Sequence, residues 1–595
     1  MGRISRRTIG VVMVVAMATS WAATRENIQP QAMFFAPVDV PLVSVEVYVF
    51  DSDGHPVAGL TLADFEIFED GKKMEISHFY ASPGVSTLPA QDGETPDVER
   101  VEAAPDKGDT SDNDFVEAAP AQDLYLVVYF DDTNLRRGRR QAAVEYLEEF
   151  LSSELPPDLK VMLVRYDGRN HIEQAFTEET DEVLAALEVL KNAASLSRQI
   201  DETMLIREIE VAAAFASMNM GGRDGGMKEL ELSGRSLWQS IETFAKQMVH
   251  RTRTSIENEK RIISSLSGLS GRKAILLVTD GVEARPGEAL YRAWGQVFGV
   301  VPAFRIDSQR AFLQASRNDL SNEFDGLAQF ANGHRVSFYT LSDAGAGLAR
   351  GVSAETKLMD EERLAANQGM SAEVLMMNMA GTTGGRSLVN TPALAGQLNE
   401  VSQELASYYS LAFEPQHLGD GEYHRLNVKI NREGVRIRHR EGYLDIPEAE
   451  RINNKTLAAA IHGVADNPLG ISVATSGEFI RRKDGTFLVP VITTVPIGQL
   501  VLIPSADEHQ GRISIHLTVR GRRGDLSPTV HREYPINIPN DHLAGALGQS
   551  AGFTMRLAVR PGRQRIAVGL RDEVARTESV TYVEADVGDT PGTDG

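Results

Sequence analysis

Short, continuously apolar segments alternate with helical patterns between residues 124 and 389. The first segment, Leu124–Phe130, contains no polar interruption, which is typical of a strand buried on both faces of a sheet. Similar segments follow at 161–164, 171–176, 274–278 and 336–339, with a short edge strand at 386–389. Strands that alternate with helices predict an α/β fold, in which a mostly parallel sheet is covered by helices on both faces.

A long helical region interrupts this alternation between residues 192 and 270, and a glycine-rich break at 221–226 divides it. Its second half has apolar residues near heptad spacing, which is typical of a seam between packed helices. These residues are Leu237, Ile241, Phe244, Met248, Ile256, Ile263 and Leu266. We therefore expect a helical hairpin inserted into the α/β domain.

Strand patterns stand on both sides of this domain. Residues 43–49 alternate valine with other side chains, the period of a half-buried strand, and 408–440 contain three further strand patterns that predict an antiparallel meander. Each flank has too few strands to be stable alone. Because the termini of compact domains often lie close together, we predict that both flanks pair into one β-sandwich.

The remaining segments differ in composition. Residues 83–122 are rich in Pro, Ala, Asp and Glu and have too little apolar surface to fold, so we expect an acidic disordered linker. Evenly spaced strand patterns after residue 470 predict a second sandwich. The expected domains are a signal peptide at 1–22, a β region at 38–82, the linker, the α/β domain at 123–405, the meander at 406–446, a C-terminal sandwich at 447–587 and a frayed tail at 588–595.

The N-terminus predicts export. Arg3, Arg6 and Arg7 precede an apolar run at 9–18, and Ser20-Trp21-Ala22 fits a signal-peptidase site. The alternative is an uncleaved anchor helix, but the run is shorter than the ~20 residues that a span needs. We expect a periplasmic or extracellular protein with no membrane span after cleavage.

Composition excludes several classes of function. The formal net charge of −23 argues against nucleic acid as a partner. With no cysteine, the chain has no disulfides, thiolate metal sites or cysteine nucleophiles. The motifs of serine hydrolases, zinc proteases and phosphate-binding loops are also absent from the sequence. We expect the histidines to be scattered, with His417, His424 and His439 on strand-rich surface and not in a shared crevice.

Polar residues follow two of the buried strands. Asp131 and Thr133 follow the first strand, and Asp280 follows the strand at 274–278. Open α/β sheets bind ligands at the carboxyl ends of their strands, and carboxylates with hydroxyls suit Mg²⁺. The alternative is that Asp131 and Asp280 only cap turns and helices there.

Four segments of the chain, in this order, are distinctive: 59–71 (GLTLADFEIFEDG), 271–281 (GRKAILLVTDG), 383–386 (TGGR) and 408–415 (YYSLAFEP). Together they resemble a secreted bacterial group built around the von Willebrand factor A domain. The resemblance implies a Rossmann-like von Willebrand A domain with a helical insertion, flanked by antiparallel β-sandwich domains. It also implies a metal-ion-dependent adhesion site for Mg²⁺ or Mn²⁺, whose first loop has the pattern Asp-x-Ser-x-Ser.

Matched to that pattern, Asp131 is the aspartate and Thr133 the first hydroxyl, whereas Leu135 stands at the second hydroxyl position and cannot ligate. Asp280 matches the family's later aspartate, and Thr203 is the candidate for its threonine. The resemblance therefore implies a degenerate site with weak metal binding or none. Replacement of Leu135 by serine is expected to restore a ligand.

The resulting hypothesis is an exported, non-enzymatic protein that binds another protein or a surface polymer in the manner of an adhesion protein. One alternative is a structural or scaffold protein of the cell envelope with a vestigial metal site. A more remote alternative is a hydrolase that acts outside the cytoplasm.

Overall fold

The computed structural model describes residues 42–86 and 123–588, except 193–199, 220–224, 343–360, 390–393, 476–478 and the single residues 136, 154, 157, 300, 418 and 523. The predicted signal peptide lies outside the described residues. So do residues 87–122 of the predicted linker and residues 589–595 of the predicted tail.

The α/β region is built on a six-stranded sheet with the order β10-β9-β8-β5-β6-β7. All neighbouring strands are parallel except β7, which pairs antiparallel with β6 at one edge. Numbered within the sheet, this is the order 3-2-1-4-5-6 of doubly wound folds, which confirms the α/β prediction. The strands are β5 (Leu124–Asp131), β6 (Leu159–Tyr166), β7 (Asn170–Thr177), β8 (Arg272–Val278), β9 (Val336–Ser342) and β10 (Ser387–Val389).

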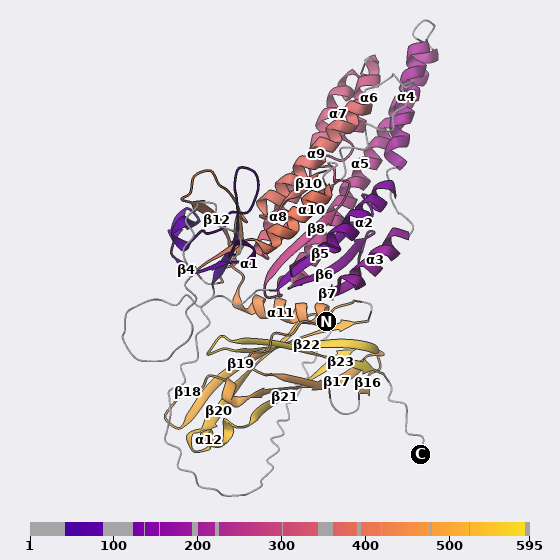
Figure 1. Cartoon of the computed structure of the whole chain (residues 1–595). Helices are drawn as coiled ribbons and strands as arrows, with labels where there is room; N and C mark the ends of the chain where they lie inside the picture. Colours follow the sequence, from indigo (N-terminus) through magenta and orange to yellow (C-terminus); the bar gives the residue numbers. More distant parts are fainter. Residues whose placement is uncertain are drawn as a thin grey trace. The chain divides into compact units, whose positions relative to one another are not determined.

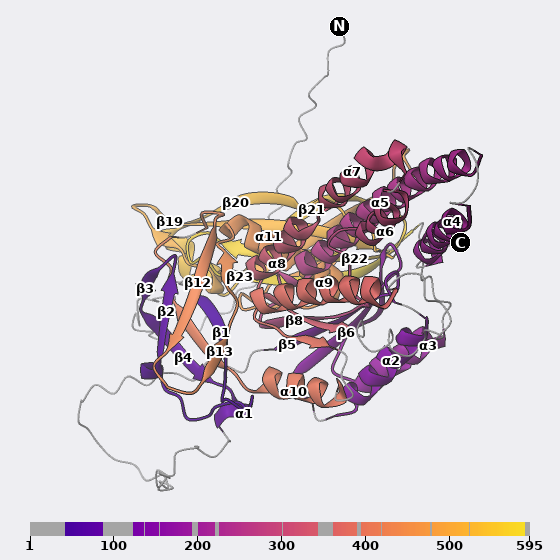
Figure 2. The ribbon, with the colours of Figure 1, turned by 90° about the horizontal axis from the view of Figure 1, so that it is seen from above.

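Helices cover both faces of this sheet (Figures 1 and 2). Side chains of β5 alternate between the two faces, so that Val128 packs in one core and Val127 in the other. The first core is closed by α2 (Arg137–Leu151), α3 (Thr180–Asn192) and α10 (Leu394–Ala406). The second is closed by α8 (Ser321–Gly333), α9 (Glu361–Thr382) and the C-terminal part of α5 (Gly225–Leu266).

The expected hairpin of the helical insertion packs against two further helices that follow β8 in the chain. α4 (Ile200–Asn219) and α5 share a core with α6 (Glu288–Phe298) and α7 (Arg305–Arg317). The predicted apolar seam of α5 packs in two different cores, one within the helices and one on the sheet. Its N-terminal residues, such as Ile241, face α6, where Trp294 donates a hydrogen bond of 2.8 Å to the Gly234 carbonyl. Its C-terminal residues, such as Ile263, pack on the sheet.

Residues on either side of the α/β region form two facing four-stranded sheets. β1 pairs antiparallel with β11, Val45 opposite Leu411, and β2 pairs with β12, Ile67 opposite Val428. The orders are β13-β1-β11-β4 and β14-β12-β2-β3. The strands are β1 (Val43–Phe50), β2 (Phe65–Glu69), β3 (Lys72–Met74), β4 (Ile76–Ala81), β11 (Tyr409–Phe413), β12 (Tyr423–Ile430), β13 (Arg436–Arg438) and β14 (Gly442–Leu444). The α/β region is thus an insertion into this first sandwich.

Two details of this sandwich correct the sequence prediction. The strands of 406–446 do not form a meander, because β11 and β12 lie in different sheets and each pairs with a strand of the N-terminal flank. Pairing across the insertion lets both flanks bury their apolar faces in one core, whereas a meander would leave the N-terminal strands without partners. Residues 83–86, expected in the linker, form the helical turn α1 (Pro83–Ser86), in which Val85 is buried.

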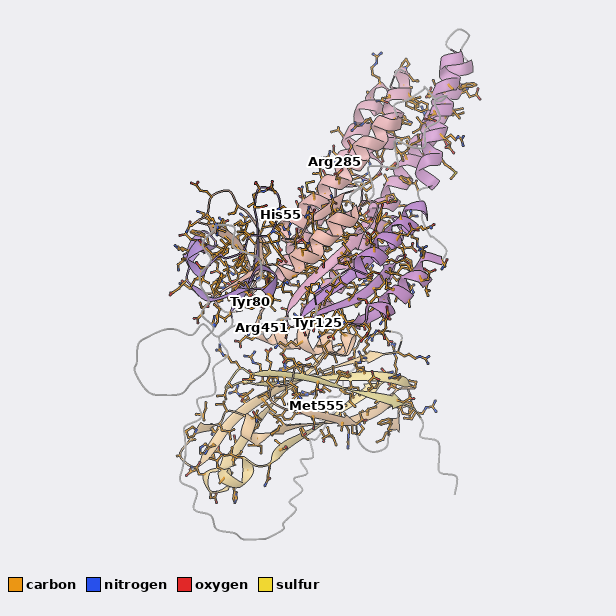
Figure 3. All side chains as sticks on the ribbon, viewed as in Figure 1. His55, Tyr80, Tyr125, Arg285, Arg451 and Met555 are labelled. Carbon is orange, nitrogen blue, oxygen red and sulfur yellow. The ribbon has the colours of Figure 1, made fainter. Side chains whose placement is uncertain are left out.

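The C-terminal region contains a second pair of sheets around one apolar core, in which Met555 lies (Figure 3). One sheet contains β15 (Ser472–Thr475), β16 (Ile480–Arg481), β17 (Phe487–Pro496) and β21 (Ser550–Val559). The other contains β18 (Ile503–Pro504), β19 (Glu508–Gly521), β20 (Val530–Pro539), β22 (Gly562–Asp572) and β23 (Glu578–Val587). Helix α11 (Glu448–His462), which the sequence analysis missed, packs on the second sheet through Ile452 and Ala459.

Candidate functional site

The carboxyl ends of β5 and β8 form the point at which the strand order reverses, where doubly wound sheets bind their ligands. Asp131 is the last residue of β5, and Thr279 and Asp280 directly follow β8. All three side chains are buried: Asp131 is 2 %, Thr279 1 % and Asp280 9 % exposed. The predicted aspartates therefore lie at the expected edge of the sheet, but beneath the surface.

The carboxylate of Asp131 is hydrogen-bonded on both oxygens. Oδ1 accepts from the backbone N–H of Thr133 (3.2 Å) and from its hydroxyl (2.7 Å). Oδ2 accepts from Asn134 Nδ2 (2.6 Å) and from the Thr279 hydroxyl (3.4 Å). This network holds the loop after β5 without a metal ion, as in the alternative in which the aspartate only caps a turn.

Glu259 of helix α5 is a site residue that the sequence analysis missed. It is 5 % exposed; its Oε1 accepts from the Ser255 hydroxyl at 3.2 Å, and its Oε2 is buried without a hydrogen bond. A signal was present in the sequence, because Glu259 occupies a seam position between Ile256 and Ile263 where the heptad pattern calls for an apolar residue. A charged side chain buried in such a seam indicates that a specific neighbouring group, such as an opposite charge or a hydrogen-bond donor, accompanies it.

The protonation of Glu259 depends on its burial and on Asp131. Burial raises the pKa of Glu259 to about 8, and the negative charge of Asp131 adds to this effect. Burial also raises the pKa of Asp131, while hydrogen bonds from Thr133 and Asn134 oppose the increase. Repulsion between two buried carboxylates favours the uptake of one positive charge. A proton on Glu259, or a cation close to both carboxylates, would supply it.

Three other residues of the predicted site are placed as follows. Leu135 is 2 % exposed and belongs to the apolar core between the sheet and α2. Asp132, the residue after Asp131, is buried beside Arg140, with 3.4 Å between Oδ1 and Nε. Thr203 lies in the first turn of α4, and its side chain is outside the described residues.

The loop after β8 is covered by helix α9. Gly281 has φ +100°, and a Cβ there would lie 2.8 Å from the Cβ of Ala372 on α9. This contact leaves no room for a larger residue and closes the loop against the helix. A cavity of about 830 Å³ lies elsewhere, lined by residues of α8, α9 and β12 that include Phe324, Leu375 and Tyr423. Among the described residues, the side chains of Asp131, Glu259 and Thr279 are thus buried, and helix α9 covers the loop after β8.

No family model and no curated protein matches the chain. A solved aerotolerance-related membrane protein from Bacteroides fragilis, with multiple mutations to serines, is 9% identical with a TM-score of 0.22, and the match covers 48% of this chain and 98% of that one. The conserved hypothetical protein BatB from Bacteroides thetaiotaomicron is 10% identical with a TM-score of 0.20, over 48% and 100%.

An uncharacterized membrane spanning protein from Vibrio fischeri is 14% identical with a TM-score of 0.11, over 48% of this chain and 98% of that one. Within the part of the chain that the structure describes, no helix combines the length and the apolar character that a membrane crossing requires.

Proposed function

We propose that this chain is an exported, non-enzymatic protein that binds another protein. In this proposal the α/β region is a von Willebrand factor A domain, which the four sequence segments and the 3-2-1-4-5-6 strand order support. The partner contacts the outer face of the helical insertion and not the degenerate adhesion site. The enclosure of Asp131 favours this choice, because an adhesion site must offer its metal an open position for the ligand.

The observation that carries the proposal is the outer face of helix α4. Its inner face packs on the core of the insertion, where Ile209 is fully buried. Met204, Val211 and Phe215 recur at i, i+7 and i+11, so they share another face, and they are 52%, 65% and 39% exposed. Exposed Glu208, at i+4 from Met204, lies on the same face, so the stripe is apolar apart from one carboxylate. Exposed apolar side chains that gather on one helix face are typical of a protein-binding surface.

Binding through this stripe is testable with the double variant Val211→Glu/Phe215→Ser. We expect at least a tenfold loss of partner capture from envelope extract, because charge on an apolar contact is strongly unfavourable and about 1.4 kcal/mol already accounts for tenfold. Val189→Glu on α3 is the matched control, since Val189 is 71% exposed and outside the stripe. EDTA should have no effect on capture.

The alternative, a structural envelope protein whose site is vestigial, predicts a different result. Capture would then be equal in the wild type, the stripe variant and the Val189→Glu control. Capture that EDTA abolishes and that the stripe variant retains would instead indicate an open adhesion site.

A weak internal site for Mg²⁺ or Mn²⁺ belongs to the same proposal. The carboxylates of Asp131 and Glu259 and the hydroxyls of Thr133 and Thr279 are oxygen ligands of the kind these ions prefer, and Asn134 can present its amide oxygen by a side-chain flip. The buried Glu259 Oε2 without a hydrogen bond supports this fit. A bound ion would neutralise the buried carboxylates and hold the loop after β5.

Millimolar Mg²⁺ or Mn²⁺ should therefore raise the melting temperature by a few degrees relative to EDTA. At ten times Kd the gain is about 1.4 kcal/mol, and 1 kcal/mol corresponds to about 2–4 °C for a domain of this size. Asp131→Asn should abolish the difference between metal and EDTA. If the wild type melts at the same temperature in metal and in EDTA, the metal part of the proposal fails, while binding through α4 is unaffected.

A further inference from the structure

Two histidines and four carboxylates gather at one edge of the first sandwich. The rings of His417 and His424 are stacked, with 3.7 Å between their centroids and 16° between their planes. The sequence analysis expected these histidines to be scattered, and this expectation was wrong. His417 follows β11 and His424 lies in β12, and the connection between the two strands folds back so that the rings meet.

Each imidazole nitrogen of the pair lies close to a carboxylate oxygen. His417 Nε2 is 3.3 Å from Glu69 Oε1, and His417 Nδ1 is 3.1 Å from Asp445 Oδ2. His424 Nδ1 is 2.8 Å from Asp70 Oδ2, and His424 Nε2 is 3.2 Å from Asp420 Oδ2. Four carboxylates therefore surround the two imidazole rings, and neutral rings would offer them no opposite charge.

Neutral imidazoles cannot satisfy this arrangement. Each neutral ring has one N–H, so its second nitrogen would direct a lone pair at a carboxylate oxygen. His417 Nε2 is in fact buried without a hydrogen bond, beside a glutamate that is only 6 % exposed. Glu69 Oε1 accepts a hydrogen bond of 2.5 Å from Tyr443, which fixes the carboxylate toward the rings. The cluster therefore requires positive charge, which protons on the rings or a bound cation would supply.

We propose that Glu69, His417 and His424 bind a transition-metal ion of the zinc type, with Asp420 or Asp445 as a further ligand. The ligand atoms of the first three lie within 4.8 Å of one another, and so do those of His417, Asp420 and Asp445. Tetrahedral ligands at 2.0–2.1 Å from zinc are roughly 3.3 Å apart. The distance between Glu69 and His417 already has this value.

Two imidazoles with carboxylates distinguish this site from the oxygen-only site near Asp131. Imidazole favours zinc, copper and nickel, whereas Mg²⁺ and Ca²⁺ prefer oxygen ligands. Bringing both stacked rings onto one ion requires rotations of the two side chains, since their nitrogens must converge on one point. Each ring that binds the ion through one nitrogen keeps an N–H on the other, which a neighbouring carboxylate outside the ligand set can accept as a second partner.

The ion would join the two flanks of the chain. Glu69 lies on β2, before the α/β insertion, and both histidines lie after it. His424 is on β12, which pairs with β2, and His417 is in the connection from β11 to β12. A metal bound only by the folded sandwich stabilises it by mass action. This inference is independent of the proposed partner-binding function, since it concerns the sandwich that carries the α/β domain.

The test is zinc titration of the full chain by calorimetry, with Co²⁺ absorption as a readout of geometry. We expect one high-affinity zinc ion, a tetrahedral Co²⁺ spectrum that zinc displaces, and a higher melting temperature with zinc than with EDTA. His424→Gln and Glu69→Gln should each weaken zinc binding at least ~100-fold, because each removes a ligand. Glutamine at 69 can still accept from Tyr443, so this variant retains the local hydrogen bond.

His55→Gln is the control. His55 lies on a turn of the first sandwich, in an exposed group with Asp51 and Asp53 whose ligand atoms are equally close (Figure 3). This variant should bind zinc as the wild type does. Loss of binding in His55→Gln, no zinc binding by the wild type, or an octahedral Co²⁺ spectrum would each overturn the proposal. If the other variants fail to fold, the wild-type stoichiometry and Co²⁺ spectrum still decide it.

Discussion

Replacing Glu259 with glutamine should stabilise the protein at neutral and alkaline pH and flatten the dependence of its stability on pH. The pKa of Glu259 rises from 4.5 to about 8 in the folded chain. Between these values the folded state retains a proton that the unfolded state releases, so the free energy of unfolding falls as pH rises. The slope is about 1.4 kcal/mol per pH unit, and it ends above the folded pKa.

Glutamine has the shape of the protonated glutamic acid and stays neutral at every pH. The variant should therefore match the wild type near pH 4.5 and exceed it by about 3 kcal/mol at pH 7. Urea unfolding at pH 5, 6, 7 and 8 measures the difference. Glu257→Gln, at an exposed position of the same helix, should follow the wild-type curve.

The same experiment connects to the proposed metal site. Saturating Mg²⁺ should reduce the wild-type slope, because the ion replaces the proton between Asp131 and Glu259, and it should not affect Glu259→Gln. Parallel pH profiles for the wild type and Glu259→Gln in EDTA would show that Glu259 is not held as a neutral acid, and the argument for a shared cation would lose its basis.

The buried strands of the α/β region were predictable because their signal is local. The apolar run Leu124–Phe130 predicted a strand covered on both faces, and β5 spans Leu124–Asp131 with fully packed cores on either side. The heptad stripe of α5 likewise identified a packing seam. It could not show that the seam changes partners along its length, because helix α6 comes from a later part of the chain.

The pairing of strands that are distant in sequence was harder to predict. The strand patterns in 408–440 predicted strands correctly, but neighbours in sequence were assumed to be neighbours in the sheet. The sequence predicted that the two flanks pair, but not that the strands of the C-terminal flank separate into two sheets, with β11 beside β1 and β12 beside β2. The surroundings of His417 and His424 depend on the same pairing, since it places Glu69 and Asp70 beside the two rings.

Matching the loop after β5 to the adhesion-site pattern also gave an incomplete account of Leu135. Leu135 was considered only as a missing hydroxyl ligand, which implied that serine would restore one. The structure places Leu135 in the core between the sheet and helix α2, together with Phe130, Val144 and Leu147. Its role is packing, so the loop after β5 is anchored by burial at Leu135 and by hydrogen bonds at Asp131.

Leu135→Ser should therefore destabilise the protein by about 2–5 kcal/mol, the range for truncating a buried leucine, and the unpaired hydroxyl adds to the cost. Mg²⁺ or Mn²⁺ should not recover this loss. Leu232→Ser, at a 62% exposed position of α5, is the control and should leave the urea midpoint unchanged. A Leu135→Ser variant as stable as the wild type, with a larger metal-dependent increase in melting temperature, would mean that residue 135 can turn toward Asp131. The degenerate loop would then be one substitution away from a working adhesion site.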